Sequence, residues 1–162
     1  MPNSRKGSRS LRQSGLSLRK PPRQPGAEEL LGGPRKEPSA AEEAREAVKA
    51  ELADLALPLD VLILGMGNDG HTASLFPDAP ELAEAISVDC PDRVAAATPP
   101  SQSQQRITLT WPALKDARFT ALHLKGQDKL ETLEQALANP SDVVAMPVRA
   151  FLQSGLNVFW SP

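Results

Sequence analysis

Apolar residues recur along the chain at two different spacings, and each spacing predicts a type of secondary structure. Between Ser39 and Pro58 they recur every three or four residues, the spacing of one helix face, and Ser39 with Glu42 three residues later is a helix-start signature. The pattern predicts an amphipathic helix that begins at Ser39 and ends before Pro58. A second helix is predicted over residues 127–138. Its inner face is predicted to carry three leucines, Leu130, Leu133 and Leu137.

Short apolar runs predict strands between and after these helices. Residues 60–65, Asp-Val-Leu-Ile-Leu-Gly, form a nearly continuous apolar run, which is typical of a strand buried on both faces of a parallel sheet. Further strands are predicted over residues 93–98, 106–110, 118–124 and 156–160. Strands that alternate with helices indicate an α/β fold, so we expect a Rossmann-like, mostly parallel sheet flanked by helices.

The distribution of charge divides the chain near residue 37. Residues 1–36 contain nine Lys and Arg and two Glu, a net charge of +7, whereas residues 37–162 contain nine basic and eighteen acidic residues, a net charge of -9. The first segment is rich in Arg, Ser, Pro and Gly, and its leucines follow neither a helical nor a strand period, so it cannot bury enough apolar surface to fold. We therefore expect a disordered basic leader over residues 1–37 and an α/β domain over residues 38–162.

Composition argues against several classes of protein. The single cysteine, Cys90, permits no internal disulfide. No apolar run approaches the ~18 residues that a membrane span needs, and the first residues lack the apolar segment of a signal peptide, so we expect no membrane partner and a cytoplasmic location. Nucleic-acid binding through residues 1–36 is an alternative function. The acidic remainder of the chain disfavours it, and we expect no nucleic-acid partner. The oligomeric state stays open.

The candidate chemistry lies in the loop that follows the strand at residues 60–65. The loop reads Gly-Met-Gly-Asn-Asp-Gly-His-Thr over residues 65–72, and open α/β sheets bind ligands at the carboxyl ends of strands. Its glycines allow the backbone to turn sharply and to approach a ligand closely. His71 can serve as a base near neutral pH. Asp69, two residues earlier, is placed to orient the imidazole of His71.

The same glycines spell the dinucleotide-binding pattern G-x-G-x-x-G, but its context is absent. The third glycine, Gly70, would have to open a long helix, and Pro77 and Pro80 allow at most two turns. The two histidines, His71 and His123, lie far apart in the sequence and the chain has a single cysteine, which disfavours a metal site. We therefore expect neither a metal nor another cofactor.

Several motifs of the chain occur in an order typical of one enzyme family. They are GMGNDGHTASLFP, RITLT, ALKDAR, GQDK and MPVRAFL, and they span about residues 39–162. In these motifs the chain resembles the 6-phosphogluconolactonases, a sister group of the glucosamine-6-phosphate deaminases. The resemblance implies hydrolysis of a phosphorylated sugar lactone, 6-phosphoglucono-1,5-lactone, in the pentose phosphate pathway.

The resemblance also implies roles for individual residues in catalysis. His71 would be the general base that activates water, and Asp69 would hold its imidazole in the right tautomer. Gly67 and Gly70 would let the loop backbone bind the substrate at close range.

Two cations correspond to family positions that contact the phosphate of the substrate. Arg106 begins the strand predicted over residues 106–110, and Lys129 lies in the first turn of the helix predicted over residues 127–138. A lysine in the first turn opposes the helix dipole, which is compensated when an anion binds at that helix end. We therefore expect both side chains to bind phosphate.

The chain departs from the family in its first part. Members of the family carry there a strand with a Ser-Gly-Gly loop that binds phosphate, and an Asp-Glu-Arg motif, and neither motif occurs in this sequence. We therefore expect the C-terminal part of a lactonase, with an incomplete sheet that exposes strand edges and apolar faces, and weak or absent activity. The alternatives are a catalytically impaired fragment that binds sugar phosphate and a deaminase. Phe76 disfavours the deaminase, because those enzymes carry a carboxylate at this position.

Overall fold

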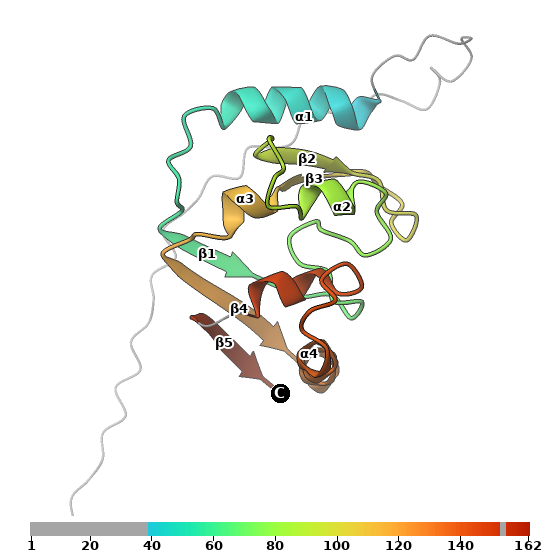
Figure 1. Ribbon diagram of the computed structural model, residues 1–162. Coiled ribbons are helices and arrows are strands. Elements are labelled where there is room, and N and C mark those ends of the chain that lie inside the picture. Colours follow the sequence, from blue (N-terminus) through green and yellow to red (C-terminus); the bar gives the residue numbers. More distant parts are fainter. Residues whose placement is uncertain (1–38, 153–154) are drawn as a thin grey trace, which may run out of the picture. The chain divides into compact units, whose positions relative to one another are not determined.

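The computed structural model describes residues 39–152 and 155–162, which belong to one compact unit of the chain, residues 37–162. The leader expected over residues 1–37 lies outside the described residues. The elements follow one another in the order shown in Figure 1. They are α1 (Ala40–Glu51), β1 (Val61–Leu64), α2 (Leu82–Ala85), β2 (Val94–Ala97), β3 (Arg106–Leu109), α3 (Trp111–Leu114), β4 (Phe119–Lys125), α4 (Gln127–Ala138), the 3₁₀ helix η1 (Pro147–Phe151) and β5 (Leu156–Ser161).

Three strands form a parallel sheet in the order β1-β4-β5 (Figure 1). β1 pairs with β4 from Val61 opposite Phe119 to Leu64 opposite Leu122, and β4 pairs in parallel with β5. Helices lie in the connections between these strands, with α3 before β4 and α4 before β5, as parallel pairing requires. The expectation of an α/β fold with a mostly parallel sheet flanked by helices is confirmed.

The hydrophobic core lies against one face of this sheet and includes residues of the segment that follows β1 and of the helices that follow β3. The strands contribute leucines to this core. Leucines two residues apart on one strand point to the same face of the sheet. They pack with apolar residues of α3, α4 and η1. The members of the core include Leu64, Leu122, Leu124, Leu114, Leu133, Ala136, Val148 and Phe151. The ring of Trp111 packs edge-on against Phe151, with 4.9 Å between the ring centroids.

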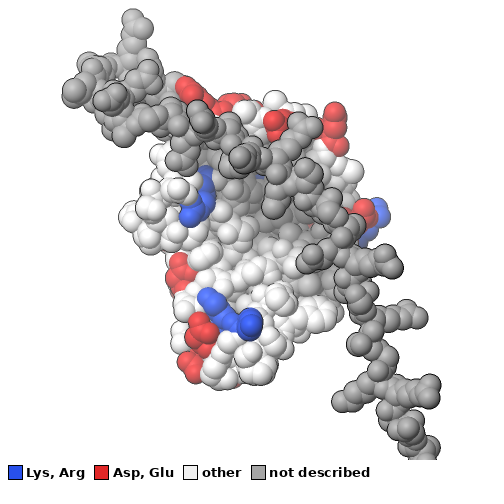
Figure 2. All heavy atoms as spheres, turned by 180° about the vertical axis from the view of Figure 1, so that it is seen from behind, with Lys and Arg blue, Asp and Glu red and all other residues white. Residues whose placement is uncertain are grey.

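A second, smaller sheet consists of β2 and β3. The two strands pair antiparallel, with Val94 opposite Leu109, and α1 packs against both of them (Figure 1). Acidic residues lie on the exposed side of α1. In Figure 2, acidic side chains are visible at the top of the molecule. The exposed acidic residues of α1 include Glu43, Glu46 and Glu51. The helix therefore separates an acidic outer side from the side that faces the β2–β3 pair.

The start of α1 agrees with the prediction, and its end does not. The side chain of Ser39 accepts a hydrogen bond of 3.2 Å from the backbone N–H of Glu42, as an N-cap residue does. The helix ends at Glu51 and turns occupy residues 52–54, so the predicted extension toward Pro58 is wrong. The apolar spacing continues beyond Glu51, but the chain leaves the helix there to reach β1.

The prediction that the first strand is buried on both faces is also wrong. In β1, Val61 and Ile63 are 58% and 70% exposed, whereas Leu64 is 4% exposed. The described residues therefore cover one face of this strand, and the expectation of an exposed apolar face is met. A continuous apolar run shows which residues can be buried but not whether a neighbour is present to bury them.

The inner face of α4 differs from the predicted one by a rotation of the helix. Its buried residues include Leu133, as predicted, but Leu137 is 54% exposed. Thr132 and Ala136 are buried instead. The buried Arg149 donates to backbone carbonyls at the last turn of α4. Within the described ranges, each helix is too short or too polar to cross a bilayer.

Candidate active site

The loop of residues 65–72 and the start of α4 lie at one edge of the parallel sheet. β1 ends at Leu64, directly before the loop, and β4 ends at Lys125, directly before the residue that caps α4. Because β1 and β4 are parallel neighbours, their carboxyl ends lie at the same edge. This edge is where α/β sheets bind their ligands.

Hydrogen bonds within the loop hold it in a compact turn. The hydroxyl of Thr72 donates to the carbonyl of Gly65 at 2.7 Å. The backbone N–H of Gly67 donates to the carbonyl of His71 at 2.9 Å, and the N–H of Gly70 donates to the carbonyl of Gly67 at 3.0 Å. Gly70 has a φ of 78°, in the left-handed region that favours glycine. The backbone of the loop is therefore fixed by its own contacts.

His71 and Asp69 are brought together as the sequence predicted. Oδ1 of Asp69 lies 2.6 Å from Nδ1 of His71, and the same oxygen accepts the backbone N–H of His71 at 3.0 Å. The two side chains are 28% and 40% exposed, so solvent reaches both. Because the contact with Asp69 takes up Nδ1, Nε2 is the ring nitrogen left to act on a water molecule or a substrate.

The imidazole ring packs against an aromatic ring and lies close to a glycine. The ring centroids of His71 and Phe76 lie 4.2 Å apart, with 32° between the ring planes, and Phe76 is buried. A Cβ atom on Gly67 would lie less than 3.0 Å from Nδ1 of His71 and 2.6 Å from Oδ1 of Asp69. A side chain at position 67 therefore does not fit beside the pair. Apart from the glycines themselves, no local pattern of residues predicts this packing.

Lys129 contacts the same loop from α4. It lies in the first turn of the helix, and its Nζ donates a hydrogen bond to Oδ1 of Asn68. Asn68 directly precedes Asp69, so the ammonium group belongs to the surroundings of the His71–Asp69 pair. No signal in the sequence predicts a role for Asn68, because a contact between residues 61 positions apart leaves no local pattern.

Arg106 lies at the start of β3 and is not joined to this group. Its guanidinium donates to the side-chain oxygens of two glutamines, at 3.2 and 3.4 Å. Among the described residues, no hydrogen bond or ion pair links Arg106 to the loop of residues 65–72 or to Lys129. β3 does approach the segment after the loop, because the backbone N–H of Ser74 donates to Oγ1 of Thr108 at 3.3 Å.

The segment at η1 supports both the loop and α4. The backbone N–H of Val148 donates to the carbonyl of Gly70 at 2.9 Å, and the side chain of Met146 fills the space beside Gly70. Arg149 is 8% exposed and donates to three backbone carbonyls at distances of 2.9 to 3.2 Å. These carbonyls belong to Gln135, Ala136 and Asp142. A cation at the carboxyl end of α4 satisfies carbonyls that the helix leaves unpaired.

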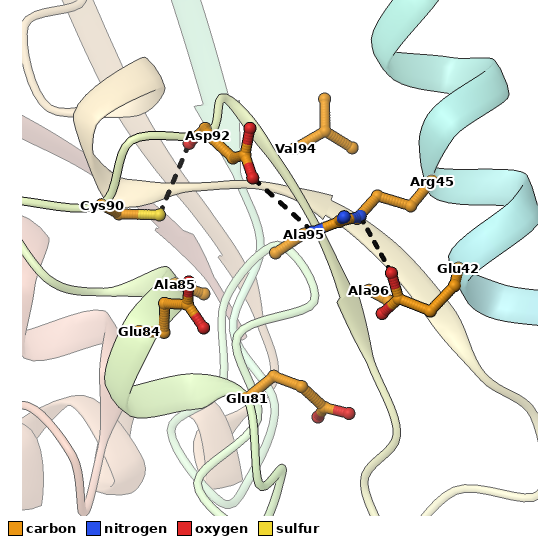
Figure 3. Close-up of a pocket in the computed structure, with 10 residues that line it drawn as sticks. All are labelled: Glu42, Arg45, Glu81, Glu84, Ala85, Cys90, Asp92, Val94, Ala95 and Ala96. Carbon is orange, nitrogen blue, oxygen red and sulfur yellow. Dashed lines mark hydrogen bonds and ion pairs between the residues drawn. The ribbon is translucent and has the colours of Figure 1, made fainter. Parts of the chain in front are cut away.

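A separate hollow of about 70 Å³ lies between α1, α2 and β2 (Figure 3). Three of its charged side chains pair with one another, Arg45 with Glu42 at 3.2 Å and with Asp92 at 3.6 Å. The thiol of Cys90 donates to the carbonyl of Asp92 at 3.5 Å, and a hydrogen bond from Lys49 lowers the pKa of the Asp92 carboxyl. Small-molecule sites usually have ~300–1,000 Å³, so this hollow is too small for a sugar phosphate.

The described part of the chain contains no group of three or more His, Cys, Asp or Glu side chains placed to hold a metal. The other histidine, His123, lies exposed on β4. The helix that follows Gly70 is α2, which has four residues and begins at Leu82, so the glycine loop does not open a long helix as a dinucleotide site requires.

Comparison with known proteins places this arrangement in a family. A profile described as glucosamine-6-phosphate isomerases/6-phosphogluconolactonase matches residues 11–160. The chain belongs to this family. The 6-phosphogluconolactonase of Pseudomonas aeruginosa is 47% identical over 121 residues, which are 75% of this chain and 50% of that protein. That of Rhizobium meliloti is 41% identical over 125 residues, 75% of this chain and 53% of that protein.

A solved structure of the same family has the same fold. The crystal structure of a 6-phosphogluconolactonase from Shewanella baltica matches with a TM-score of 0.70 and 40% identity, over 75% of this chain and 52% of that one. The resemblance inferred from the motifs is thus confirmed. The chain spans about half the length of the curated relatives it matches.

Proposed function

We propose that this chain carries the catalytic part of a lactonase that hydrolyses 6-phospho-D-glucono-1,5-lactone to 6-phospho-D-gluconate, in the pentose phosphate pathway of the cytoplasm. The observation that carries the proposal is the 2.6 Å contact between Nδ1 of His71 and Oδ1 of Asp69, at the edge of the sheet where ligands bind. Relatives named 6-phosphogluconolactonase at 41% and 47% identity support it.

The proposed reaction needs a base and one water molecule, because the lactone carbonyl is already electrophilic. Nε2 of His71 accepts a proton from water while the water oxygen forms a bond to C1, and the carbonyl electron pair moves onto the carbonyl oxygen. When the C=O bond forms again, the bond between C1 and the ring oxygen breaks, and the imidazolium returns the proton to that oxygen. Asp69 stabilises the imidazolium in between. A positioned base of this kind contributes about 10²–10⁴-fold to the rate.

The phosphate would bind beside the loop, where Lys129 supplies positive charge. An anion there would also interact favourably with the N-terminal end of α4. The N–H groups of Gly67 and Gly70 are engaged within the loop, so in this proposal the two glycines act through close packing rather than as hydrogen-bond donors. The His71–Asp69 pair lies beside Gly67, and Met146 lies beside Gly70. Arg106 would become a second phosphate contact by exchanging its glutamine partners for phosphate oxygens.

The second candidate function is binding of a sugar phosphate without turnover. This candidate is favoured because the chain spans about half the length of its relatives. A site that is formed by both halves of a domain would lack part of its wall when one half is absent. A deaminase activity is disfavoured, because the ring of Phe76 is buried against His71 and offers no second acid or base there.

Hydrolysis of the lactone by the full chain, measured above the spontaneous rate, tests the proposal. We expect His71→Ala to lower kcat at least about 100-fold with an unchanged circular dichroism spectrum. His123→Ala, which alters an exposed histidine on β4, is the matched control and should leave the rate unchanged. Lys129→Ala and Arg106→Ala should mainly raise KM, and a normal KM would remove either cation from the phosphate site.

Two outcomes contradict the catalytic proposal. One is a rate in His71→Ala equal to that of the unaltered chain, since the base would then lie elsewhere. The other is a background rate from the unaltered, folded chain. If that chain nevertheless binds 6-phosphogluconate and Lys129→Ala weakens this binding, the second candidate function replaces the first.

A further inference from the structure

Asn68 connects the glycine loop to α4 through one side-chain contact. Its Oδ1 accepts a hydrogen bond from Nζ of Lys129, which lies in the first turn of α4. Asn68 directly precedes Asp69, the residue whose carboxylate pairs with His71. The contact therefore brings a cation from a distant part of the chain to a loop that already contains an acid and a base.

The partner of this ammonium group is neutral, although a carboxylate follows it in the sequence. Oδ1 of Asp69 is occupied by the ring and the backbone N–H of His71. The second oxygen of Asp69, Oδ2, has no hydrogen-bond or ion-pair partner among residues 39–152 and 155–162, and the side chain is 40% exposed. An ammonium group on a flexible four-carbon stem is attracted to such an oxygen. Over the same described residues, however, no ion pair joins Lys129 to an acidic side chain.

A neutral acceptor and a carboxylate leave the site with different charges. An amide oxygen accepts a hydrogen bond without cancelling the charge of the ammonium group, whereas an ion pair with Asp69 would neutralise both groups. Asp69 would then stabilise the imidazolium of His71 less, and Lys129 would attract a phosphate less. Contacts between exposed side chains add little to folding stability. The contact of Asn68 with Lys129 is therefore better explained by where it holds the charge than by the stability of the fold.

We propose that Asn68 is a positioning residue, whose amide oxygen holds the ammonium group of Lys129 beside the loop and away from Oδ2 of Asp69. Lys129 then keeps its charge for the phosphate of the substrate, and Asp69 keeps its charge for His71. Asn68 acts through these two charges and takes no part in bond formation. The inference rests on the proposed function, in which Lys129 binds the phosphate and His71 is the base.

The first test is a double-mutant cycle that needs neither turnover nor a ligand. It follows the NMR signals of the His71 imidazole in the full 162-residue chain, in Asn68→Ala, in Lys129→Ala and in the double variant. In Asn68→Ala the ammonium group should move to Asp69, and the imidazole signals should shift. In the Lys129→Ala background the same substitution should shift them much less, because no ammonium group is left to move. Equal shifts in the two backgrounds, or no shift in Asn68→Ala, would overturn the proposal.

The second test changes the charge of the acceptor. Asn68→Asp places a carboxylate against Lys129, so the affinity for 6-phosphogluconate should fall and the KM for the lactone should rise, each about tenfold, while kcat changes less than about threefold. Both effects should shrink as the salt concentration rises, because the contact is exposed. Asn139→Asp is the matched control, because it adds the same charge at the opposite end of α4, and it should leave the affinity and KM unchanged.

The outcomes separate the role of Asn68 from the proposed activity. An unchanged affinity and KM in Asn68→Asp would overturn the role of Asn68, whatever the rate of hydrolysis. A chain that does not hydrolyse the lactone, but binds 6-phosphogluconate less tightly in Asn68→Asp, would keep the role of Asn68 and lose the proposed activity. A folded chain that binds no 6-phosphogluconate would overturn the role of Asn68 together with the phosphate role of Lys129.

Discussion

Replacing Gly67 by alanine tests whether the close packing around His71 matters for catalysis. The new Cβ would lie less than 3.0 Å from Nδ1 of His71 and 2.6 Å from Oδ1 of Asp69, whereas carbon atoms make unstrained contacts at about 3.5–4.0 Å. The imidazole and the carboxylate would each have to move by on the order of 1 Å. A displacement of that size at a reacting group costs about 10²-fold in rate, so we expect kcat to fall about 100-fold.

The stability of the Gly67→Ala chain should change much less than its activity. Gly67 does not have a left-handed φ, so alanine is not strained by the backbone. Replacing glycine by alanine also stabilises a folded protein by about 0.4–1 kcal/mol through the unfolded chain, which offsets part of the cost of moving the ring. We therefore expect a Tm within a few degrees of the unaltered value, because a change of 1 kcal/mol in stability shifts the Tm of a domain of this size by about 4 °C.

Gly65→Ala is the matched control for this experiment. A Cβ on Gly65 would meet nothing within 4 Å, so this variant should keep the unaltered rate. The assay is lactone hydrolysis corrected for the spontaneous reaction, together with the NMR signals of the His71 imidazole, which report its surroundings without turnover. An unaltered rate and unaltered His71 signals in Gly67→Ala would refute the reasoning, and so would an equal loss in Gly65→Ala.

Three further substitutions separate the electrostatics of the site from the stability of the fold. Asp69→Asn should lower kcat by about 10²–10⁴-fold with KM nearly unchanged, because the partner of His71 Nδ1 loses its charge; a pH–rate profile identical to the unaltered one would argue against this role. Arg149→Met leaves three carbonyls without their buried donor, so thermal unfolding should show a loss of about 3 kcal/mol and a Tm lower by about 10 °C. Burial acts to raise the pKa of Glu81, but hydrogen bonds from the hydroxyl and backbone N–H of Thr98 outweigh it and lower the pKa. A carboxyl whose pKa is lowered by folding stabilises the folded state at a pH above its unfolded pKa, and this stabilisation is lost as the pH falls through its folded pKa. Thr98→Val should therefore be less stable than the unaltered chain at pH 7 in urea unfolding, and the two stabilities should approach each other below about pH 4. A pH-independent difference in stability would contradict the assignment.

Short-range signals in the sequence determined the secondary structure and the centre of the candidate site. These local patterns include the N-cap at Ser39, the alternation of apolar and polar residues in predicted strands, and the apolar run before the glycine loop. The predicted fold class follows from the order of the elements along the chain. The contact between Asp69 and His71 is of the same kind. Two residues that lie two positions apart in a tight loop meet through the geometry of that loop, so their spacing was enough to predict the pair.

Only the tertiary structure decided which distant residues join that pair. The contact of Lys129 with Asn68 exists because β1 and β4 are parallel neighbours, and a periodic pattern within one strand does not say which strand lies beside it. Arg106 carried the same expectation as Lys129, yet its guanidinium at the start of β3 contacts two glutamines of the preceding loop. Burial depends on partners in the same way. The apolar sequence of β1 is compatible with a strand that is covered on one face or on both faces. The exposure of Ile63 depends on whether other described residues pack against it.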